Sequence, residues 1–264
     1  MHADVTERTS TLRRPSVPSV PANLLAMQPP VFRPRDVELW SNATKELLRL
    51  AAAGVVAAPL RGYYVVVPPG RMGDRSWRPT IEGFALALAQ RVTDVDNAAL
   101  MGVSAARLHG ALPRAIGTAV VAVGEQRRSL QTEWGDVVFV SRDVDALDLQ
   151  RADTDLTAGW ITTIEQTILD VADRPTLGGI DALSASEVIA TLGPRAEWDA
   201  VVDLAQRQHR RAAYARARWV ADSVIDSDAP MPSVPAHRDR YADPLGLRPV
   251  APTDAVLFGV AKAE

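Results

Sequence analysis

The sequence predicts an α+β protein in two parts, and three observations lead to this fold class. Residues 41–67 have the pattern of a helix followed by two short strands. Residues 70–79, which are rich in proline, glycine and arginine, separate this unit from the remainder of the chain. In the remainder, short valine-rich runs mostly precede helical runs, which is the element order of a small sheet followed by helices.

Composition limits the class of protein. The chain has 264 residues, 47% of them hydrophobic, which suffices for one or two domains with cores. It contains no run of 18 apolar residues, so we expect no membrane-spanning helix. Residues 1–16 lack an apolar segment, so we expect a disordered leader rather than a secretory signal. The absence of cysteine excludes disulfides, thiolate metal sites and a cysteine nucleophile, and fits a protein of the reducing cytoplasm.

The net charge of −3 conceals an asymmetry along the chain. Residues 1–80 hold 11 arginines and lysines against 6 aspartates and glutamates, a net +5, whereas the remainder holds 18 against 26, a net −8. A basic part followed by an acidic one is typical of a nucleic-acid-binding unit joined to a unit with another role. The alternative is that charge merely fluctuates along the chain.

The first part, residues 17–69, has the element order of a winged helix-turn-helix. Residues 20–27 favour a short first helix, which two consecutive prolines end. Residues 32–40 predict a second helix. Residues 42–53 predict a third helix, with Ser41 as its N-cap.

A hairpin follows the third helix. Gly54 is suited to end the helix, and residues 55–58 and 62–67 predict two strands joined by a turn at 59–62. Three helices and a hairpin give the winged-helix layout. Residues 70–79 cannot continue the second strand and should bury nothing, so we place the domain boundary there.

The third predicted helix has an apolar and a polar face. At about 100° per residue, Leu47 and Leu50 fall on the first face, and Lys45 and Arg49 on the second. Ammonium, guanidinium and amide groups suit phosphates and base edges, so the polar face predicts a DNA contact. An ordinary amphipathic helix with a solvated face is the open alternative. The predicted DNA-binding residues are Ser41, Asn42, Thr44, Lys45, Arg49, Arg61, Tyr63, Arg33 and Arg35.

The second part, residues 80–228, is predicted to be an α+β domain. Two capping-box patterns, T-x-x-E at 162–165 and S-x-x-E at 184–187, mark helix starts. Residues 229–264 form a proline-rich tail. Helices are predicted at 80–90 and 98–108, from the capping box at 162–165 to about 173, from the second capping box to 193, and at 198–208 and 211–224, and strands at 118–123, 136–140 and within 147–161.

A search for catalytic motifs yields no site that we can support. Residues 102–106 come within one residue of the G-x-S-x-G elbow and His109 lies close by, but their flanks predict helix, whereas an elbow needs a strand and a sharp turn. No phosphate-binding glycine loop occurs. The two lysines, Lys45 and Lys262, are out of reach of a restriction-type nuclease arrangement. We therefore predict no enzymatic activity, no cofactor and no metal site.

Two charged clusters remain. The first is acidic and favours a solvated face: Asp136, Asp143, Asp145, Asp148, Asp153 and Asp155. The second is basic and suits either a solvated helix face or a grip on an acidic protein partner or RNA: Arg207, Arg210, Arg211, Arg216 and Arg218.

Three stretches of the chain stand out together. Residues 98–115 read AALMGVSAARLHGALPRA, residues 159–175 read GWITTIEQTILDVADRP, and residues 60–64 read LRGYY. They resemble, respectively, the SA-x-x-LHG-L helix, the T-x-x-x-T-L-x-D helix and the RG-x-Y wing segment of the AbiEi antitoxins of type IV toxin–antitoxin systems. The resemblance covers roughly residues 20–224, and the proline-rich tail departs from it.

This resemblance implies a winged-helix regulator that binds inverted repeats in its own promoter and represses the operon. Its C-terminal domain is implied to counteract a cognate nucleotidyltransferase-like toxin. Duplex DNA and such a toxin are therefore the expected partners, with no membrane, and with monomer and dimer both open. One competing hypothesis is a protein-interaction module whose winged helix no longer binds DNA. A cryptic enzyme, nuclease or kinase-like, has less support.

Overall fold

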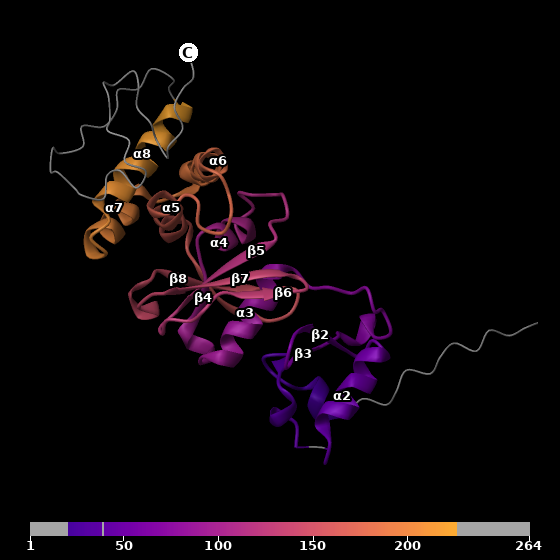
Figure 1. Ribbon diagram of the computed structural model, residues 1–264. Helices are drawn as coiled ribbons and strands as arrows, with labels where there is room; N and C mark the ends of the chain where they lie inside the picture. Colours follow the sequence, from indigo (N-terminus) through magenta and orange to yellow (C-terminus); the bar gives the residue numbers. More distant parts are fainter. Residues whose placement is uncertain (1–20, 39, 226–264) are drawn as a thin grey trace, which may run out of the picture.

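The computed structural model describes residues 21–38 and 40–225 (Figure 1). The predicted leader and the predicted tail lie outside these residues. The described protein is α+β, as predicted, with a three-stranded sheet followed by a six-stranded one. We call residues 21–67 the head and residues 80–225 the body.

The head is a small antiparallel sheet covered by helices. Its strands lie in the order β1-β3-β2, with Phe32 opposite Tyr64. The rings of these two residues stack with their centroids 6.0 Å apart. The elements in chain order are α1 (Ala22–Leu25), β1 (Val31–Phe32), the 3₁₀ turn η1 (Pro34–Asp36), α2 (Ala43–Ala52), β2 (Val56–Leu60) and β3 (Tyr63–Val66).

The predicted helix at residues 32–40 is wrong. The segment forms the end of β1 and then a single 3₁₀ turn. A residue before proline avoids the helical region, and Arg33, which precedes Pro34, is extended at φ −110° and ψ 159°. Its N–H donates to Asp36 Oδ2 at 2.7 Å, so a local turn forms instead. The hairpin of the predicted winged helix is present, but the helix-turn-helix is not confirmed.

Helix α2 and the hairpin follow the prediction with small shifts. The N-cap of α2 is Asn42, not Ser41, because Asn42 Oδ1 accepts the Lys45 N–H at 3.1 Å. Serine and asparagine cap about equally well, so the sequence alone does not choose between them. Strands β2 and β3 meet at a tight turn, Arg61–Gly62, where Gly62 has a φ of +81°. Such turns favour glycine because its backbone tolerates positive φ.

The body contains a mixed sheet in the order β6-β7-β5-β4-β9-β8. Strand β5 runs parallel to β7, and β4 runs parallel to β9, whereas the other neighbours are antiparallel. The strands predicted at 118–123, 136–140 and within 147–161 are confirmed as β5, β7 and the β8–β9 pair. The bounds are β4 (Ala98–Leu100), β5 (Thr118–Val123), β6 (Leu130–Thr132), β7 (Gly135–Ser141), β8 (Leu149–Asp153) and β9 (Ala158–Thr162).

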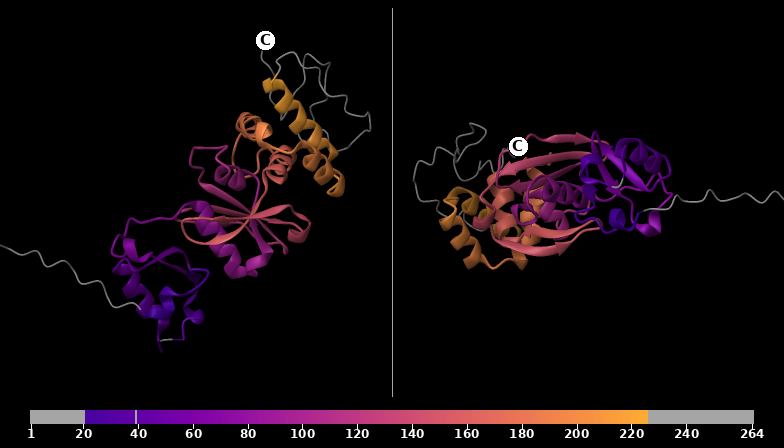
Figure 2. Two further views of the ribbon diagram at one scale, coloured as in Figure 1. Left: turned by 180° about the vertical axis from the view of Figure 1, so that it is seen from behind. Right: turned by 90° about the horizontal axis from the view of Figure 1, so that it is seen from below.

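Helices cover both faces of this sheet (Figures 1 and 2). Helix α3 lies on one face, and α4 to α8 gather on the other. Alternate residues of β5 point to opposite faces of the sheet. Val121 packs with α3, and Val120 packs with the helices on the other face. The helices are α3 (Ile81–Val92), α4 (Val103–Leu108), α5 (Ile164–Asp173), α6 (Ala182–Leu192), α7 (Trp198–Arg207) and α8 (Arg211–Ile225). Further 3₁₀ turns are η2 (Pro69–Arg71), η3 (Val95–Asn97), η4 (Val144–Ala146) and η5 (Gly193–Arg195).

The predicted helix at residues 98–108 is wrong in its first part. Ala98–Leu100 form the central strand β4, and the chain then turns sharply at Gly102, with φ +54° and ψ −127°, into α4. A short apolar run does not distinguish a buried strand from a buried helix. Strand β6 was not predicted at all.

Both predicted capping boxes are misplaced. The cap of α5 is Thr163, whose Oγ1 accepts the Gln166 N–H at 3.3 Å. The cap of α6 is Asp181, whose Oδ1 accepts the Ser184 N–H at 2.7 Å. The helices themselves are confirmed, so the pattern located the elements but not their first residues.

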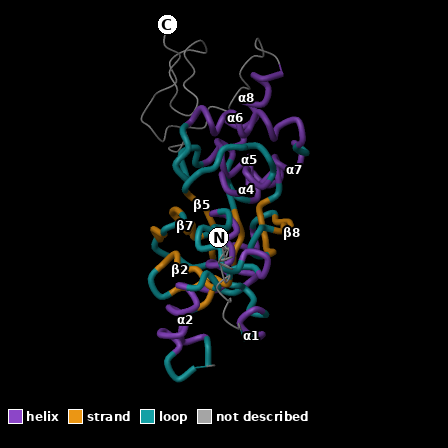
Figure 3. The backbone as a smooth tube through the Cα atoms, turned by 90° about the vertical axis from the view of Figure 1, so that its right-hand side faces the viewer, coloured by secondary structure: helices purple, strands orange, loops and turns teal. Residues whose placement is uncertain are grey.

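Head and body share a hydrophobic core at α3. Figure 3 shows the backbone of the head, with α2 and β2, below the sheet of the body. Val31 of β1 and Val65 of β3 are fully buried in the same cluster as Phe84 of α3. The Glu133 N–H donates to the Pro59 carbonyl oxygen at 2.9 Å, which adds a polar tie between the head and the β6–β7 turn. The head is therefore docked on the body through its sheet.

The connecting segment, residues 68–79, also takes part in packing, contrary to the expectation that it buries nothing. Trp77 meets Trp134 edge to face, with ring centroids 6.0 Å apart. Pro79 is buried, and the Gly73 N–H donates to the Gly54 carbonyl oxygen at 3.0 Å.

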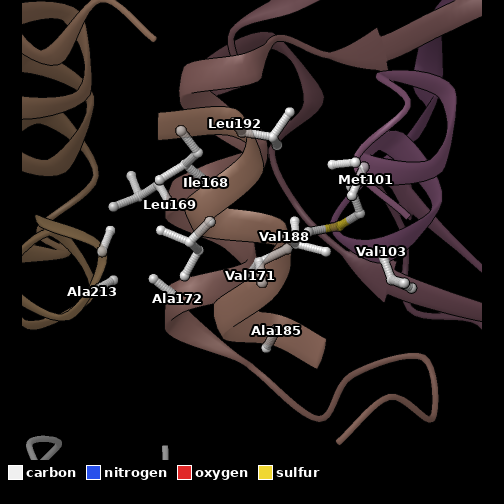
Figure 4. Close-up of a cluster of buried hydrophobic side chains, with 14 of the residues drawn as sticks. Met101, Val103, Ile168, Leu169, Val171, Ala172, Ala185, Val188, Leu192 and Ala213 are labelled. Atoms are coloured by element: carbon white, nitrogen blue, oxygen red, sulfur yellow. The ribbon is translucent and has the colours of Figure 1, made fainter. Parts of the chain in front are cut away.

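The second core lies between the sheet and helices α4 to α8. Figure 4 shows Ile168 and Leu169 of α5 near Leu192 of α6, with Met101 extending from the sheet side toward Val188. These five side chains are almost fully buried. Helix α5 is thus the central contact of the helical layer.

Leu169→Ala should lower the free energy of unfolding by about 2–5 kcal/mol, because it removes buried methyl groups and leaves a cavity. Urea unfolding of both proteins measures this difference. Leu183→Ala is the matched control, since Leu183 is 61% exposed, and should change stability little. Equal losses in the two variants would contradict the central packing role of α5.

Candidate nucleic-acid interface

The polar face of α2 is open to solvent. Leu47 and Leu50 are fully buried in the head core, which fixes the rotation of the helix. Thr44, Lys45 and Arg49 all project from the other side and are exposed, as predicted from the helical period. Leu48, also on this face, is 58% exposed.

Arg49 has a partner on its own helix. Its Nε lies 2.9 Å from Glu46 Oε2, and the Arg49 side chain is 57% exposed. Ion pairs this open to water contribute about 0–1 kcal/mol, so a phosphate or a base edge can compete for the guanidinium. The Asn42 side chain can contact a partner in fewer ways, because its Oδ1 caps α2 and only its NH₂ group takes no part in capping.

Two predicted residues meet where the end of β1 lies beside the start of β3. Arg33 follows β1 and lies beside Tyr63 at the start of β3, with its guanidinium carbon 4.5 Å from the ring centroid. An Arg33 Nη also hydrogen-bonds to the Tyr63 hydroxyl. Arg61 is exposed in the neighbouring turn, and the Arg35 side chain is 74% exposed. The two residues predicted for the wing, Arg61 and Tyr63, therefore lie at the same end of the head sheet as Arg33, which was predicted near the start of a second helix.

Asp36 ties this end of the head to α3. Arg91 Nη2 lies 2.6 Å from Asp36 Oδ2, and Arg91 Nε donates to the same oxygen at 3.1 Å. Partial burial opposes ionisation of Asp36, but the hydrogen bonds from Arg91 and from the Arg33 N–H outweigh it and lower the pKa of Asp36. The carboxylate is therefore charged at neutral pH.

A hollow of about 300 Å³ opens around this contact, and we call it the arginine hollow. Its lining comprises Arg33, Arg35, Asp36, Arg91, Val92 and Arg127. Four guanidinium groups thus surround one carboxylate, and the local charge is strongly positive. Head and body both contribute to the hollow, since Arg91 belongs to α3 and Arg127 to the β5–β6 loop.

Sequence reasoning missed Arg91 and Arg127. Arg91 lies near the end of the mostly apolar helix α3 and Arg127 lies in a loop, so neither carries a local signal. Only the docking of the head on α3 brings them beside Arg33 and Arg35. The predicted residues form two groups. One group lies on α2 or just before it: Ser41, Asn42, Thr44, Lys45 and Arg49. The other lies around the β2–β3 turn and the end of β1: Arg33, Arg35, Arg61 and Tyr63.

The elbow-like stretch has the strand, sharp turn and helix that the sequence analysis did not expect. The residue at the turn is Gly102, however, and Ser104 is fully buried. The Ser104 Oγ accepts the Val120 N–H at 2.8 Å, so this serine links α4 to β5. The geometry therefore gives Ser104 a structural contact rather than the exposure that a nucleophile needs.

His109 caps the end of α4 and contacts β9, with Nε2 2.8 Å from the Thr162 carbonyl oxygen. Since a carbonyl only accepts, Nε2 carries the proton in this contact. Burial lowers the pKa of His109, and Arg195 acts in the same direction. The histidine is therefore neutral in the folded protein at pH 7, and it lies at the end of α4.

The basic cluster on α7 and α8 is partly internal. Arg210, whose side chain is 9% exposed, lies 2.6 Å from the buried carboxylate of Asp170. Arg216 Nε donates to the Ala172 carbonyl oxygen at 2.9 Å, and Arg218 pairs with Asp222. Arg210 and Arg216 therefore tie α8 and the residue before it to α5, and Arg218 pairs within α8, which leaves less of the cluster for a partner than the sequence suggested.

No group of three or more histidine, cysteine, aspartate or glutamate side chains arranged to hold a metal ion occurs within 21–38 and 40–225. Over the same ranges, no helix is long and apolar enough to cross a bilayer. No protein-family model matches the chain, and no curated protein matches it.

The neutral state of His109 predicts a pH dependence of stability. Its folded-state pKa lies below the ordinary value of 6.5, so its contribution to stability is complete above that pH. It is lost as the pH falls toward the folded-state pKa, because only the unfolded chain then gains a proton. The slope from this one group is at most about 1.4 kcal/mol per pH unit.

His109→Gln isolates the contribution of His109 to the pH dependence of the unfolding free energy, because glutamine keeps an N–H donor but does not titrate near neutrality. Unfolding free energies of wild type and variant between pH 7.5 and 5.5 should converge as the pH falls. A difference that stays constant over that interval would exclude the neutral buried histidine.

Proposed function

We propose that this chain is a DNA-binding transcriptional autorepressor that also acts as an antitoxin. The observation that carries the DNA-binding half is the face of α2. Lys45 and Arg49 project together from an exposed surface, while the opposite face of the same helix is fixed in the head core. A hairpin with an exposed arginine at its turn follows directly, which is the arrangement of a groove-binding helix with a wing.

In this proposal α2 enters the major groove of a promoter inverted repeat. Arg49 and Lys45 face base edges or phosphates, and Thr44 and Ser41 lie toward the backbone. Asn42 makes a one-sided contact through its NH₂ group, because its carbonyl oxygen caps α2. From the wing, Arg61 and the Arg33–Tyr63 pair follow the adjacent backbone, together with Arg35.

The antitoxin half of the proposal rests on the resemblance to AbiEi antitoxins. It assigns the body to counteracting a nucleotidyltransferase-like toxin encoded beside this chain. Such a regulator acts in the cytoplasm, where the promoter and the newly made toxin are both found. A reading frame for a nucleotidyltransferase-like protein next to this gene supports the assignment, and an unrelated neighbourhood counts against it.

Arg49→Ala should weaken binding to a duplex from the region upstream of the gene and reduce sequence preference. A bidentate contact of arginine with guanine is worth about 1–3 kcal/mol, or roughly 5- to 150-fold in affinity. Lys45→Ala should weaken specific and unrelated duplexes alike, and lower the salt slope of log K by about one. Fluorescence anisotropy at several salt concentrations measures both effects.

Arg174→Ala is the matched control for these variants. Arg174 is an exposed arginine at the end of α5, on the sheet face opposite α3, and its loss should leave affinity unchanged. Unchanged affinity in the Arg49→Ala and Lys45→Ala proteins would remove α2 from the interface.

A protein-interaction module without DNA binding is the second candidate. It is favoured by the exposed Leu48 on the α2 face and by the pairing of Arg49 with Glu46. The same variants discriminate, because in this module the acidic body sequesters the partner and the wild-type chain has no affinity for the upstream duplex that Arg49→Ala or Lys45→Ala could reduce. Deleting the head is a poorer test, since Val31 and Val65 cover α3.

A further inference from the structure

We propose that the arginine hollow binds a phosphate group of the DNA backbone, so that a bound duplex contacts the body as well as the head. This inference rests on the proposed function, because it extends the same DNA contact beyond the wing. It assigns a role to Arg91 and Arg127, which lie outside the predicted helix and wing.

The first argument is charge. Four guanidinium groups and a single carboxylate line the hollow. The Asp36 carboxylate already pairs with Arg91 and accepts a hydrogen bond from the Arg33 N–H, so it does not neutralise Arg127. Arg127 instead lies 3.5 Å from Glu125, whose side chain is 85% exposed, and such a pair is weak. An anion that enters the hollow therefore meets cationic charge that is only partly compensated.

The second argument is an unsatisfied donor. The Nε of Arg127 is buried and has no hydrogen-bond partner among the described residues. A buried N–H without an acceptor costs free energy, and a phosphate oxygen is an acceptor that guanidinium groups bind with a matching fork geometry. Among the lining residues, Arg127 is thus the one whose unsatisfied N–H a phosphate oxygen would accept.

The third argument is position. Arg33 is next to Tyr63 at the wing end of the head sheet and also lines the hollow, as does Arg35. The hollow therefore continues the row of cationic side chains that begins at Arg61 in the wing turn. In this proposal, a duplex that follows the wing past Arg33 and Arg35 reaches Arg91 and Arg127 next.

The lining also favours a polymer phosphate over a small organic ligand. Val92 is the one apolar residue among those that line the hollow. Pockets for small organic molecules are mostly apolar and have volumes of about 300–1,000 Å³, so this hollow is both polar and at the lower limit. It suits a phosphate group and little else of a ligand.

The test uses the full-length chain with Arg127→Gln, and with Arg128→Gln as the matched control. Arg128 is the adjacent residue, is exposed and does not line the hollow. Binding to the upstream duplex is measured at several salt concentrations. Arg127→Gln should weaken binding about three- to tenfold and lower the salt slope by about one, while Arg128→Gln changes neither.

A third variant, Arg127→Lys, keeps the charge but removes Nε and the fork, and should recover only part of the affinity. Thermal unfolding of each variant should match the wild type, because Glu125 is 85% exposed and its pair with Arg127 at 3.5 Å is weak. In a second arm, inorganic pyrophosphate is titrated into the wild type and Arg127→Gln to separate a free anion from a backbone phosphate.

The outcomes are distinct. If Arg127→Gln keeps the wild-type DNA affinity and salt slope, the phosphate site in the arginine hollow is overturned, while the proposed α2 interface is unaffected. Equal losses of affinity in Arg127→Gln and Arg128→Gln overturn the site as well. Pyrophosphate binding that depends on Arg127, without any effect of Arg127→Gln on DNA, also overturns it in favour of a small-anion site. A wild-type chain that binds no upstream duplex removes the proposed function and this inference together.

Discussion

The burial of α3 on all sides is the constraint on which the rest of the structure depends. Every residue from 81 to 90 is buried, so this helix needs apolar cover all the way round. The six-stranded sheet supplies one side, and Val31 and Val65 of the head sheet supply part of the other. Its two buried polar side chains are satisfied, Glu82 by Arg107 at 2.7 Å and Gln90 by the Ala158 carbonyl oxygen at 2.8 Å. The head is therefore held in place by the same helix that completes the body.

Much of the fold follows from local pattern. The helical spacing of apolar residues predicted α3 and the helices that follow residue 162, and the valine-rich runs predicted β5 and β7. The burial of α3 on its remaining sides was not predicted. The errors fall where a local pattern is ambiguous. Ala98–Leu100 is too short to separate strand from helix, and Arg33 before Pro34 was counted as helical despite the conformational restriction that proline imposes on its predecessor.

The candidate interface divides in the same way. The exposed face of α2 could be predicted, because the spacing of Leu47 and Leu50 fixes the position of Lys45 and Arg49 on the helix. The arginine hollow could not be, because its members come from η1, α3 and the β5–β6 loop. Nothing in the sequence near Arg91 or Arg127 indicates that the head will dock beside them. Side chains that meet only where head and body are in contact cannot be recognised as neighbours when each part is considered alone.

The shared cover of α3 also bears on how such a chain can change over evolutionary time. A recombination event that exchanged the head for one with a different sheet would leave α3 facing side chains that were never fitted to it. Small β-branched residues at the positions of Val31 and Val65, and an acid able to meet Arg91 as Asp36 does, would have to travel with the new head. The exposed residues of α2 can change one at a time without disturbing this cover, whereas the unit that carries them is not freely exchangeable.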